Sequence, residues 1–588
     1  MKSDLLSLAL RALILLALSG AMAASLCAQE PPNLEGLWKA YKRFDVDHQG
    51  PLLIDADAGW AEFAGRRAVL EIDSGRWSVE FSPEHGRFSG YLVEEGPSGH
   101  WIQPSVMQLG AEVASPVRFT RLSEGSWRGQ VTPMPSQFTF YLPIERSEDG
   151  SLKTFLRNPE RNLGVFAQVE ELAVDGNDLQ LIGRFRGSDE TQALLRGRYH
   201  PDSGHFTLDL PAFRGGSYDF YRESDPEQSE FRARPPGEWR YAAPPALNDG
   251  WPTGTLADAR IDEERIRTMI EQEILPIDED VQSLNVHGLL VARGGVLVLE
   301  EYFHGFHRDL PHDTRSAGKS LGSVLAGAIQ HQGVDISPET RVYEALGESM
   351  DGLDPRKRAM TLEHLLTMDS GFYCDDGDGN APGNENILQS QSEQPDWYRY
   401  TLDLPMANAP GEAPVYCSAN SNLIGAVVSA RSGRPLRELV QDLIAEPMQI
   451  PSYHLNLQPT GELYLGGGSH WRARDYMKLP QMMLNGGTWN GRRIVSEDWA
   501  RQSVAETVQI GGRPYGWQWW VIDYEWLGET VRAFFAAGNG GQIFMGIPAA
   551  DLVIAFWGGN YSASAGRLAQ SELIPNHILP ATRPIHDD

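Results

Sequence analysis

The chain has 588 residues, which is too long for one hydrophobic core and predicts about two to four domains. Its formal net charge is −29, from 79 acidic and 50 basic residues. A field of that sign repels phosphate backbones, which argues against nucleic acid as a partner. The charge carries no information on fold, and we interpret it as a source of solubility.

Residues 1–28 have the pattern of a cleaved secretory signal peptide. Lys2 and Arg11 precede a short apolar run, and Ala21-Met22-Ala23 is a cleavage-type sequence. The run is shorter than the roughly 20 residues that cross a bilayer, and no later segment is long and apolar enough to do so. Cys27 could carry a lipid, but a bulky leucine precedes it. We therefore expect an exported protein, periplasmic or secreted, without a membrane span.

Residues 31–241 are predicted to form an all-β domain of unknown role. Alternating runs such as 67–72 and 138–142 are separated by turns every 8 to 12 residues, which is typical of a sandwich or a barrel. The sequence Asp175-Gly176-Asn177-Asp178 predicts one such turn. Residues 157–162 are unusually polar, and we interpret them as a charged turn that pins two strands, with a functional loop as the alternative.

After a Pro- and Gly-rich linker at 242–257, residues 258–588 are predicted to form an α+β domain. A strand pair is expected at 288–292 and 296–302, followed by helices over roughly 335–505. The closing strands are expected at 516–522, 531–536, 542–546 and 552–557. Strands at both ends of this region predict one sheet assembled from both.

Ser316-Ala317-Gly318-Lys319 opens a small-residue helix predicted to run to Ile329. Three residues apart on a helix, the hydroxyl and the amine project from one face. A lysine held neutral can remove the serine proton, and a helix N-terminus offers N–H groups to an oxyanion. The four-residue pattern alone is weak, because it recurs by chance at exposed helix starts.

Tyr416 lies one hundred residues further on, between a turn-rich approach and an apolar helix. A tyrosine beside a lysine ammonium can shuttle protons, and Ser418 could share its hydrogen bonds. The alternative is a core tyrosine with a satisfied hydroxyl. Near the end of the chain, Gly538-Asn539-Gly540 leads into a strand, whose N–H groups could complete an oxyanion hole. Alone, such a segment is mostly a hairpin.

Cys374 and Cys417 are the two cysteines left after signal removal, so one disulfide is possible in an oxidising compartment. Two buried free thiols are the alternative.

Two groups of residues imitate metal sites. His304, His307 and His312 lack the spacing of a zinc site, and we expect them in a solvated loop. The start of a calcium loop at Asp376, Asp378 and Asn380 lacks its glycine and its terminal glutamate. We predict no metal and no cofactor.

Taken together, these segments resemble the serine hydrolases related to class C β-lactamases, a superfamily that also contains DD-peptidases, esterases and 6-aminohexanoate-dimer hydrolase. The segment Leu365-Leu366-Thr367-Met368-Asp369-Ser370-Gly371, the run Gly466-Gly467-Gly468 and the run Tyr515–Trp520 are also similar to the family. The resemblance covers about residues 250–584. It implies an antiparallel sheet with flanking helices and an all-helical lobe.

The resemblance also implies roles for individual residues. Ser316 is the expected acylated nucleophile, Lys319 its proton acceptor and Tyr416 the second member of the relay. The backbone N–H groups of Ser316 and Asn539 are the expected oxyanion hole, and paired cysteines are common in the family, which favours the disulfide. The substrate-pocket candidates are Ser418, Gly538 and Gly540.

Two departures from the family pattern bear on the substrate. Ser418 stands where β-lactamases have asparagine, and Ala536 stands where they have a lysine that binds a substrate carboxylate. We therefore expect an esterase or amidase acting on a small-molecule or short-peptide substrate. The alternatives are a DD-peptidase or β-lactamase, and a non-catalytic sensor on the same fold. The sequence leaves the oligomeric state open.

Overall fold

The computed structural model describes residues 32–584 with gaps at 45–48, 83–84, 95, 105–111, 136, 211–215 and 391–395. The predicted signal peptide and Cys27 lie outside the described residues. The chain divides into two compact units. The first comprises Met1–Tyr41, Phe140–Leu156 and Phe166–Ser224, and the second comprises Lys42–Thr139, Arg157–Val165 and Asp225–Asp588. The β-rich N-terminal region therefore contributes to both units.

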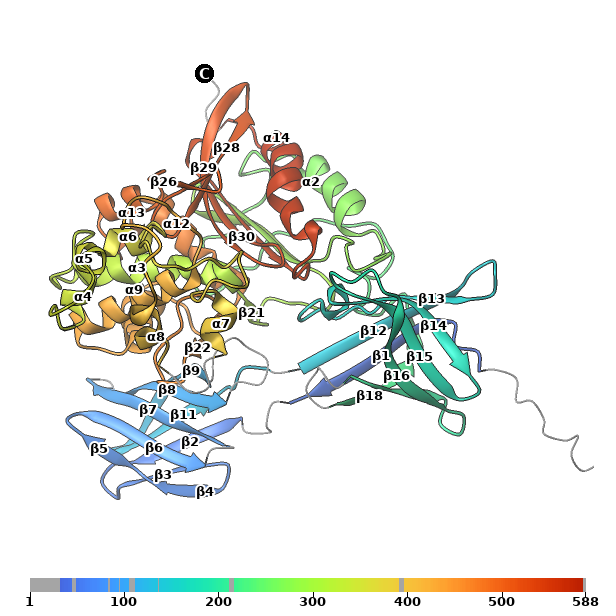
Figure 1. Cartoon of the computed structure of the whole chain (residues 1–588), viewed down its shortest axis with the longest axis horizontal. Coiled ribbons are helices and arrows are strands. Elements are labelled where there is room, and N and C mark those ends of the chain that lie inside the picture. Colours follow the sequence, from blue (N-terminus) through green and yellow to red (C-terminus); the bar gives the residue numbers. More distant parts are fainter. Residues whose placement is uncertain are drawn as a thin grey trace, which may run out of the picture. The chain divides into compact units, whose positions relative to one another are not determined.

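The first unit is built on a closed antiparallel barrel of eight strands (Figure 1). Pairing of the first and last strands, with Trp38 opposite Arg222, closes it. Alternate side chains such as Phe206 and Leu208 are fully buried inside, as the two-residue repeat of a strand requires. The predicted turn after Asp175 joins two paired strands. In chain order the strands are β1 (Gly36–Arg43), β12 (Gln137–Arg146), β13 (Leu152–Thr154), β14 (Ala167–Asp175), β15 (Asp178–Phe185), β16 (Gln192–His200), β17 (His205–Asp209) and β18 (Ser217–Arg222).

The second unit begins with a β-sandwich, so the N-terminal region holds both a barrel and a sandwich. Aromatic side chains from its two sheets share one core, with ring centroids 4.5 Å apart for Phe63 and Trp101 and 5.5 Å apart for Trp77 and Trp127. The run predicted as one strand at 67–72 is divided between β4 and β5. The strands are β2 (Gly50–Asp55), β3 (Trp60–Phe63), β4 (Arg66–Val69), β5 (Glu71–Asp73), β6 (Arg76–Ser82), β7 (Gly86–Val93), β8 (Gly96–Pro104), β9 (Glu112–Val117), β10 (Phe119–Ser123) and β11 (Ser126–Val131).

The centre of the second unit is an antiparallel sheet in the order β20-β19-β31-β30-β29-β28-β27-β26. The pairing of Leu290 with Ala555 joins β19, the first strand of the sheet in the chain, to β31, the last one, which confirms the prediction that both ends of the region build one sheet. Trp517 and Trp519, predicted in a strand, instead precede β28. The strands are β19 (Val286–Arg293), β20 (Val296–Tyr302), β26 (Val508–Ile510), β27 (Arg513–Tyr515), β28 (Trp520–Trp526), β29 (Glu529–Gly538), β30 (Gln542–Ile547) and β31 (Leu552–Gly558).

Helices cover both faces of this sheet (Figure 1). On one face lie α2 (Glu263–Met269), η2 (Ile270–Ile274), η7 (Ala569–Ile578) and α14 (Leu579–Ala581). The other face packs against a lobe made of α3 (Ser320–His331), α4 (Val342–Ala345), α5 (Pro355–Ala359), α6 (Leu362–Leu366), α7 (Glu385–Gln389), α8 (Trp397–Asp403), α9 (Ser418–Ser432), α10 (Leu436–Leu439), η4 (Val440–Ala445), α11 (Ala473–Tyr476), α12 (Lys478–Leu484) and α13 (Glu497–Ser503). The small residues of α3 allow close packing, because a Cβ added at Gly327 would lie 2.4 Å from the ring of Trp499.

The sandwich and the helical lobe share hydrogen bonds within the second unit. Strand β9 pairs with β22 (Tyr453–Leu457), with Ala114 opposite Leu455. The Gln441 amide also donates to the Ser98 hydroxyl at 2.6 Å. The sandwich is therefore continuous with the lobe through a shared sheet.

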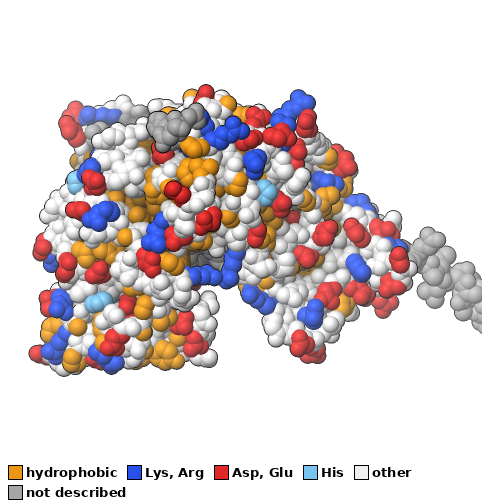
Figure 2. All heavy atoms as spheres, turned by 90° about the horizontal axis from the view of Figure 1, so that it is seen from above, with side chains coloured by type: hydrophobic (Ala, Val, Ile, Leu, Met, Phe, Trp, Pro, Cys, Tyr) orange, Lys and Arg blue, Asp and Glu red, His pale blue; other side chains and the backbone are white. Residues whose placement is uncertain are grey.

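Acidic side chains are scattered among lysines and arginines over the face shown in Figure 2. Within residues 32–584, apart from the gaps given above, no helix is long and apolar enough to cross a membrane.

Candidate active site

Ser316 and Lys319 lie on a short 3₁₀ turn, η3 (Arg315–Lys319), which precedes α3 instead of forming its first turn as predicted. Residues three apart are nearly eclipsed in a 3₁₀ helix, so the two side chains meet. The Lys319 Nζ donates to Ser316 Oγ at 3.0 Å and to the carbonyl oxygen of Gly466 at 2.5 Å. Lys319 is only 1% exposed, whereas Ser316 is half-buried. The hydroxyl is thus open to a ligand while the amine beneath it is shielded.

The glycine run 466–468 packs against the backbone of η3, the turn that carries Ser316. The Gly468 N–H donates to the Arg315 carbonyl at 3.2 Å, and Gly467 has a φ of +136°. A Cβ at Gly467 would lie 2.6 Å from the Arg315 carbonyl oxygen and 3.1 Å from the Ser316 nitrogen. Only glycine fits this approach, and it leaves the backbone around Ser316 with its present geometry.

Tyr416 is brought to the same place from one hundred residues away. The Lys319 Nζ lies 5.1 Å from the centre of the Tyr416 ring. That ring stacks on Trp520, with centroids 5.6 Å apart at an interplanar angle of 21°. Tyr515 packs edge-on against Trp520 at 4.7 Å. The Lys319 amine therefore lies beside both Ser316 Oγ and the Tyr416 ring, which stacks on Trp520.

The charge on Lys319 differs from the neutral amine that we expected. Burial lowers its pKa, but attraction to Tyr416, Glu385 and Asp376 outweighs burial, and the net pKa of Lys319 is raised. Lys319 therefore carries its proton at neutral pH in the resting site. It must lose that proton before it can accept another.

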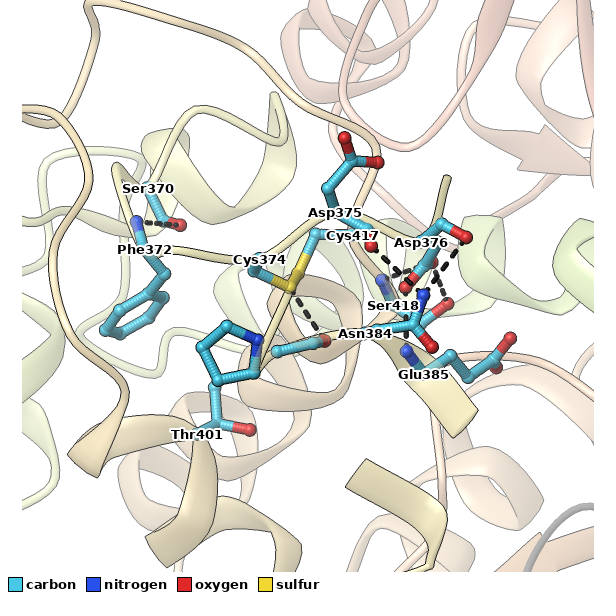
Figure 3. The surroundings of a disulfide bond; sticks show 12 residues. Ser370, Phe372, Cys374, Asp375, Asp376, Asn384, Glu385, Thr401, Cys417 and Ser418 are labelled. Atoms are coloured by element: carbon cyan, nitrogen blue, oxygen red, sulfur yellow. Dashed lines mark hydrogen bonds between the residues drawn. A yellow bond between two sulfur atoms is a disulfide. The ribbon is translucent and has the colours of Figure 1, made fainter. Parts of the chain in front are cut away.

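Cys374 and Cys417 form a disulfide with Cα atoms 5.7 Å apart, which confirms the predicted pairing and excludes free thiols. The bond joins the residue after Tyr416 to the loop before α7 (Figure 3). Ser418 is fully buried, and its hydroxyl donates to an Asp376 carboxylate oxygen at 2.6 Å. Because Ser418 is fully buried and its hydroxyl hydrogen is donated to Asp376, its side chain is not exposed to a ligand, contrary to its expected place in the substrate pocket.

The glycines at the end of β29 lie against the nucleophile turn. A Cβ at Gly538 would lie 2.2 Å from the Thr314 carbonyl oxygen, so the strand edge touches the residues that precede Ser316. The Asn539 carboxamide is bonded to Ser562, accepting from its N–H at 2.7 Å, which leaves only the backbone of Asn539 for an oxyanion role. Gly540, with a φ of +102°, packs beside the ring of Tyr561.

Two contributors to the site were not predicted. Arg161 pairs with Asp313 at 3.0 Å, and Asp313 also pairs with Arg315, the residue before Ser316. The polar run 157–162 therefore braces the nucleophile turn, and through Asn158 and Glu160 it also bonds to Thr139 of β12. Asp376 is the other contributor, and its sequence resemblance to a calcium loop gave no indication of this place.

Of the three histidines before Ser316, His307 is exposed as expected, whereas His304 and His312 are buried. His304 and His312 are 7% and 5% exposed, and the His312 and His287 rings share a 2.8 Å hydrogen bond. Among the described residues, no group of three or more His, Cys, Asp or Glu side chains could hold a metal ion.

The chain is similar to several known proteins. The beta-lactamase family model matches residues 277–564. The 6-aminohexanoate-dimer hydrolase of Paenarthrobacter ureafaciens is 26% identical over 298 residues, which are 49% of this chain and 74% of that protein. A penicillin-binding protein homologue from Caulobacter crescentus is 16% identical, with 52% of this chain and 94% of that chain covered at a TM-score of 0.40. A family VIII carboxylesterase is 15% identical, with 57% and 98% covered at a TM-score of 0.42.

Proposed function

We propose that residues 277–564, which match the beta-lactamase family model, act as a serine hydrolase that cleaves an ester or amide bond through an acyl-enzyme on Ser316. The observation that carries the proposal is the 3.0 Å contact of Lys319 Nζ with Ser316 Oγ, next to the ring of Tyr416. A half-buried hydroxyl in contact with a buried cation, which itself lies beside a phenol ring, has the groups that serine activation requires.

The proposed acylation starts with loss of one proton to solvent from the Lys319–Tyr416 pair, because Lys319 is protonated at rest. The pair then accepts the Ser316 proton while Oγ bonds to the substrate carbonyl carbon. Backbone N–H groups of Ser316 and Asn539 hold the oxyanion. The bond to the leaving alcohol or amine breaks as Tyr416 returns the proton to it. Water, deprotonated by the same pair, then attacks the acyl-enzyme, releases the carboxylic acid and restores Ser316.

The substrate class follows from what surrounds the serine. Ala536 is 2% exposed on β29 and paired with Phe544, so this position supplies no cation for a substrate carboxylate. The aromatic wall of Tyr416 and Trp520 favours an apolar acyl or leaving group. The relative named for 6-aminohexanoate dimers supports a small linear substrate. We therefore favour a small ester or amide, and place β-lactams and cell-wall peptides second.

Labelling with a fluorophosphonate tests the proposal directly. We expect one adduct per chain by intact mass, mapped to Ser316 by peptide analysis, and turnover of short-chain nitrophenyl esters exceeding that of nitrocefin. Ser316→Ala should lose both the label and the turnover while keeping the wild-type circular dichroism spectrum. An unlabelled Ser316 would instead support a non-catalytic binding protein, and undiminished turnover by the variant would refute the assignment.

We also propose that the protein is exported. The disulfide between Cys374 and Cys417 supports this, because such bonds persist in oxidising compartments and are rare in the cytosol of most organisms. N-terminal sequencing of the protein from a periplasmic or culture-medium fraction should give a mature terminus near residue 28. Recovery of the intact N-terminus in the cytosol alone would contradict export.

A further inference from the structure

Asp376 holds the segment that carries Tyr416 from both sides. Its backbone N–H donates to the Tyr416 carbonyl oxygen at 3.0 Å. Its carboxylate accepts from the Ser418 backbone N–H at 2.8 Å and from the Ser418 hydroxyl at 2.6 Å (Figure 3). The disulfide holds Cys417 between these two points. Three consecutive residues are thus fixed to one short loop.

The second carboxylate oxygen is engaged as well. It accepts from the Glu385 backbone N–H, the first residue of α7, at 3.1 Å. The N-cap of that helix, Asn384, donates its side-chain amide to the carbonyl oxygens of Asp375 and Asp376 at 3.1 and 3.2 Å. The carboxylate is therefore held in one orientation by three N–H or O–H donors and cannot turn out to solvent without losing them.

We propose that Asp376 is a positioning residue of the acid–base pair, whose carboxylate fixes the Tyr416 segment and supplies negative charge to Lys319. This inference rests on the proposed function. Holding the loop would not require the carboxylate to lie near Lys319. The Asp376 carboxylate nevertheless interacts electrostatically with the Lys319 amine.

The charges around Lys319 come from three segments. Tyr416 approaches from the residues before α9, Asp376 from the loop after the disulfide, and Glu385 from α7. The Glu385 carboxylate accepts from the Tyr464 hydroxyl at 2.7 Å. Burial raises the pKa of Asp376, while Lys319 and the Ser418 hydrogen bonds lower it and Glu385 raises it further. Lys319 in turn has a raised pKa, so Asp376 and Lys319 act on each other.

The interaction between Asp376 and Lys319 predicts the direction in which the pH dependence of kcat/KM changes when Asp376 is replaced. Loss of the proton from the Lys319–Tyr416 pair is made harder by each negative charge that faces it. The rise of kcat/KM with pH reports that proton in the free enzyme. Removing the Asp376 charge should therefore move the rise to lower pH, by about one pH unit. Loosening the Tyr416 segment should separately lower the plateau, by about tenfold.

The experiment compares Asp376→Asn with Ser418→Ala on one nitrophenyl ester from pH 5.5 to 10. Asp376→Asn keeps the shape and removes the charge, so both the position of the rise and the plateau should change. Ser418→Ala removes one hydrogen bond and keeps the charge, so only the plateau should fall. Asp376→Glu keeps the charge on a longer side chain, and its rise should stay near the wild-type pH.

If kcat/KM of folded Asp376→Asn rises at the same pH as in the wild type, the inference is overturned. It is also overturned if the rise moves as far in Ser418→Ala as in Asp376→Asn. If Asp376→Asn fails to fold, the Asp376→Glu and Ser418→Ala pair decides, because a displaced rise in either contradicts the assigned role. Fluorophosphonate labelling of wild-type Ser316 separates the two hypotheses. If wild-type Ser316 is labelled but the rise of kcat/KM does not move in Asp376→Asn, only the role of Asp376 is refuted. If wild-type Ser316 is not labelled, the proposed hydrolase function is refuted.

Discussion

Replacing Lys319 with methionine is expected to lower kcat/KM for an ester by about 10⁴-fold while the protein stays folded. Methionine has nearly the length of lysine, so the buried space remains filled. The variant loses the donor to Ser316 Oγ and to the Gly466 carbonyl, and the cation beside Tyr416. Ser316 then lacks the neighbouring amine that the proposed relay uses, so removal of its hydroxyl proton is impaired.

Lys478→Met is the matched control for this variant. Lys478 is also fully buried, and its Nζ contacts Asp475 at 3.0 Å and the Gln449 carbonyl at 2.9 Å. Its loss should lower the free energy of unfolding by about 1–3 kcal/mol, because Asp475 loses one partner but keeps Arg472 at 2.6 Å, without a comparable loss of turnover by the folded fraction. Steady-state kinetics and thermal melts on both variants give the comparison. Activity of Lys319→Met within tenfold of wild type would remove Lys319 from the mechanism.

Acidification is expected to destabilise the protein well above the pH at which carboxylates usually titrate. Burial lowers the pKa of His100, His312 and His454 to about 3 and that of His470 to about 4. In the unfolded chain these groups titrate near 6.5, so below that pH the unfolded state binds protons that the folded state excludes. The stability they contribute is complete above pH 6.5 and is lost as the pH falls toward 4.

At pH 5 each of the four histidines costs about 2 kcal/mol of unfolding free energy, or about 8 kcal/mol together. Burial raises the pKa of Glu160 to about 7, so this group is protonated first in the folded state and returns about 3 kcal/mol over the same range. A net loss of about 5 kcal/mol is comparable with the whole stability of many domains.

Urea unfolding followed by circular dichroism at pH 7.5, 6.0 and 5.0 measures this loss. His454→Asn keeps a polar atom near the Ser115 hydroxyl, which lies 2.7 Å from His454 Nδ1, and removes one titration. Its stability should fall less steeply with acid, by about 1.4 kcal/mol per pH unit. A wild-type unfolding free energy that stays constant from pH 7.5 to 5.0 would contradict the assignment.

The parts of the fold that follow a local pattern could be predicted from the sequence. Alternation and turns indicated the hairpin of β19 and β20, which the pairing of Leu290 with Glu300 confirms. The resemblance to a family placed Ser316, Lys319 and Tyr416 together, although they are up to one hundred residues apart. It also supported the disulfide, which spacing alone had left open beside free thiols.

What could not be predicted depends on contacts between distant segments. Arg161 pairs with Asp313 across 152 residues, and no local pattern around residues 157–162 encodes that partner. The protonated state of Lys319 could not be predicted from the sequence, because it depends on side chains that only the fold brings near the amine. Besides Tyr416, the groups that outweigh burial are Asp376, in the loop after Cys374, and Glu385, the first residue of α7. The sequence around them suggested only an incomplete calcium site.

The pairing of β9 with β22 constrains how this enzyme can be shortened. A fragment starting at the predicted hydrolase boundary, Asp258, would lack β9 and leave the backbone of Leu455, Asn456 and Leu457 without its ladder partners. Uncovered strand edges recruit other chains, so such a fragment is prone to self-association during expression. Productive truncations should therefore retain the sandwich and not be cut at the apparent start of homology.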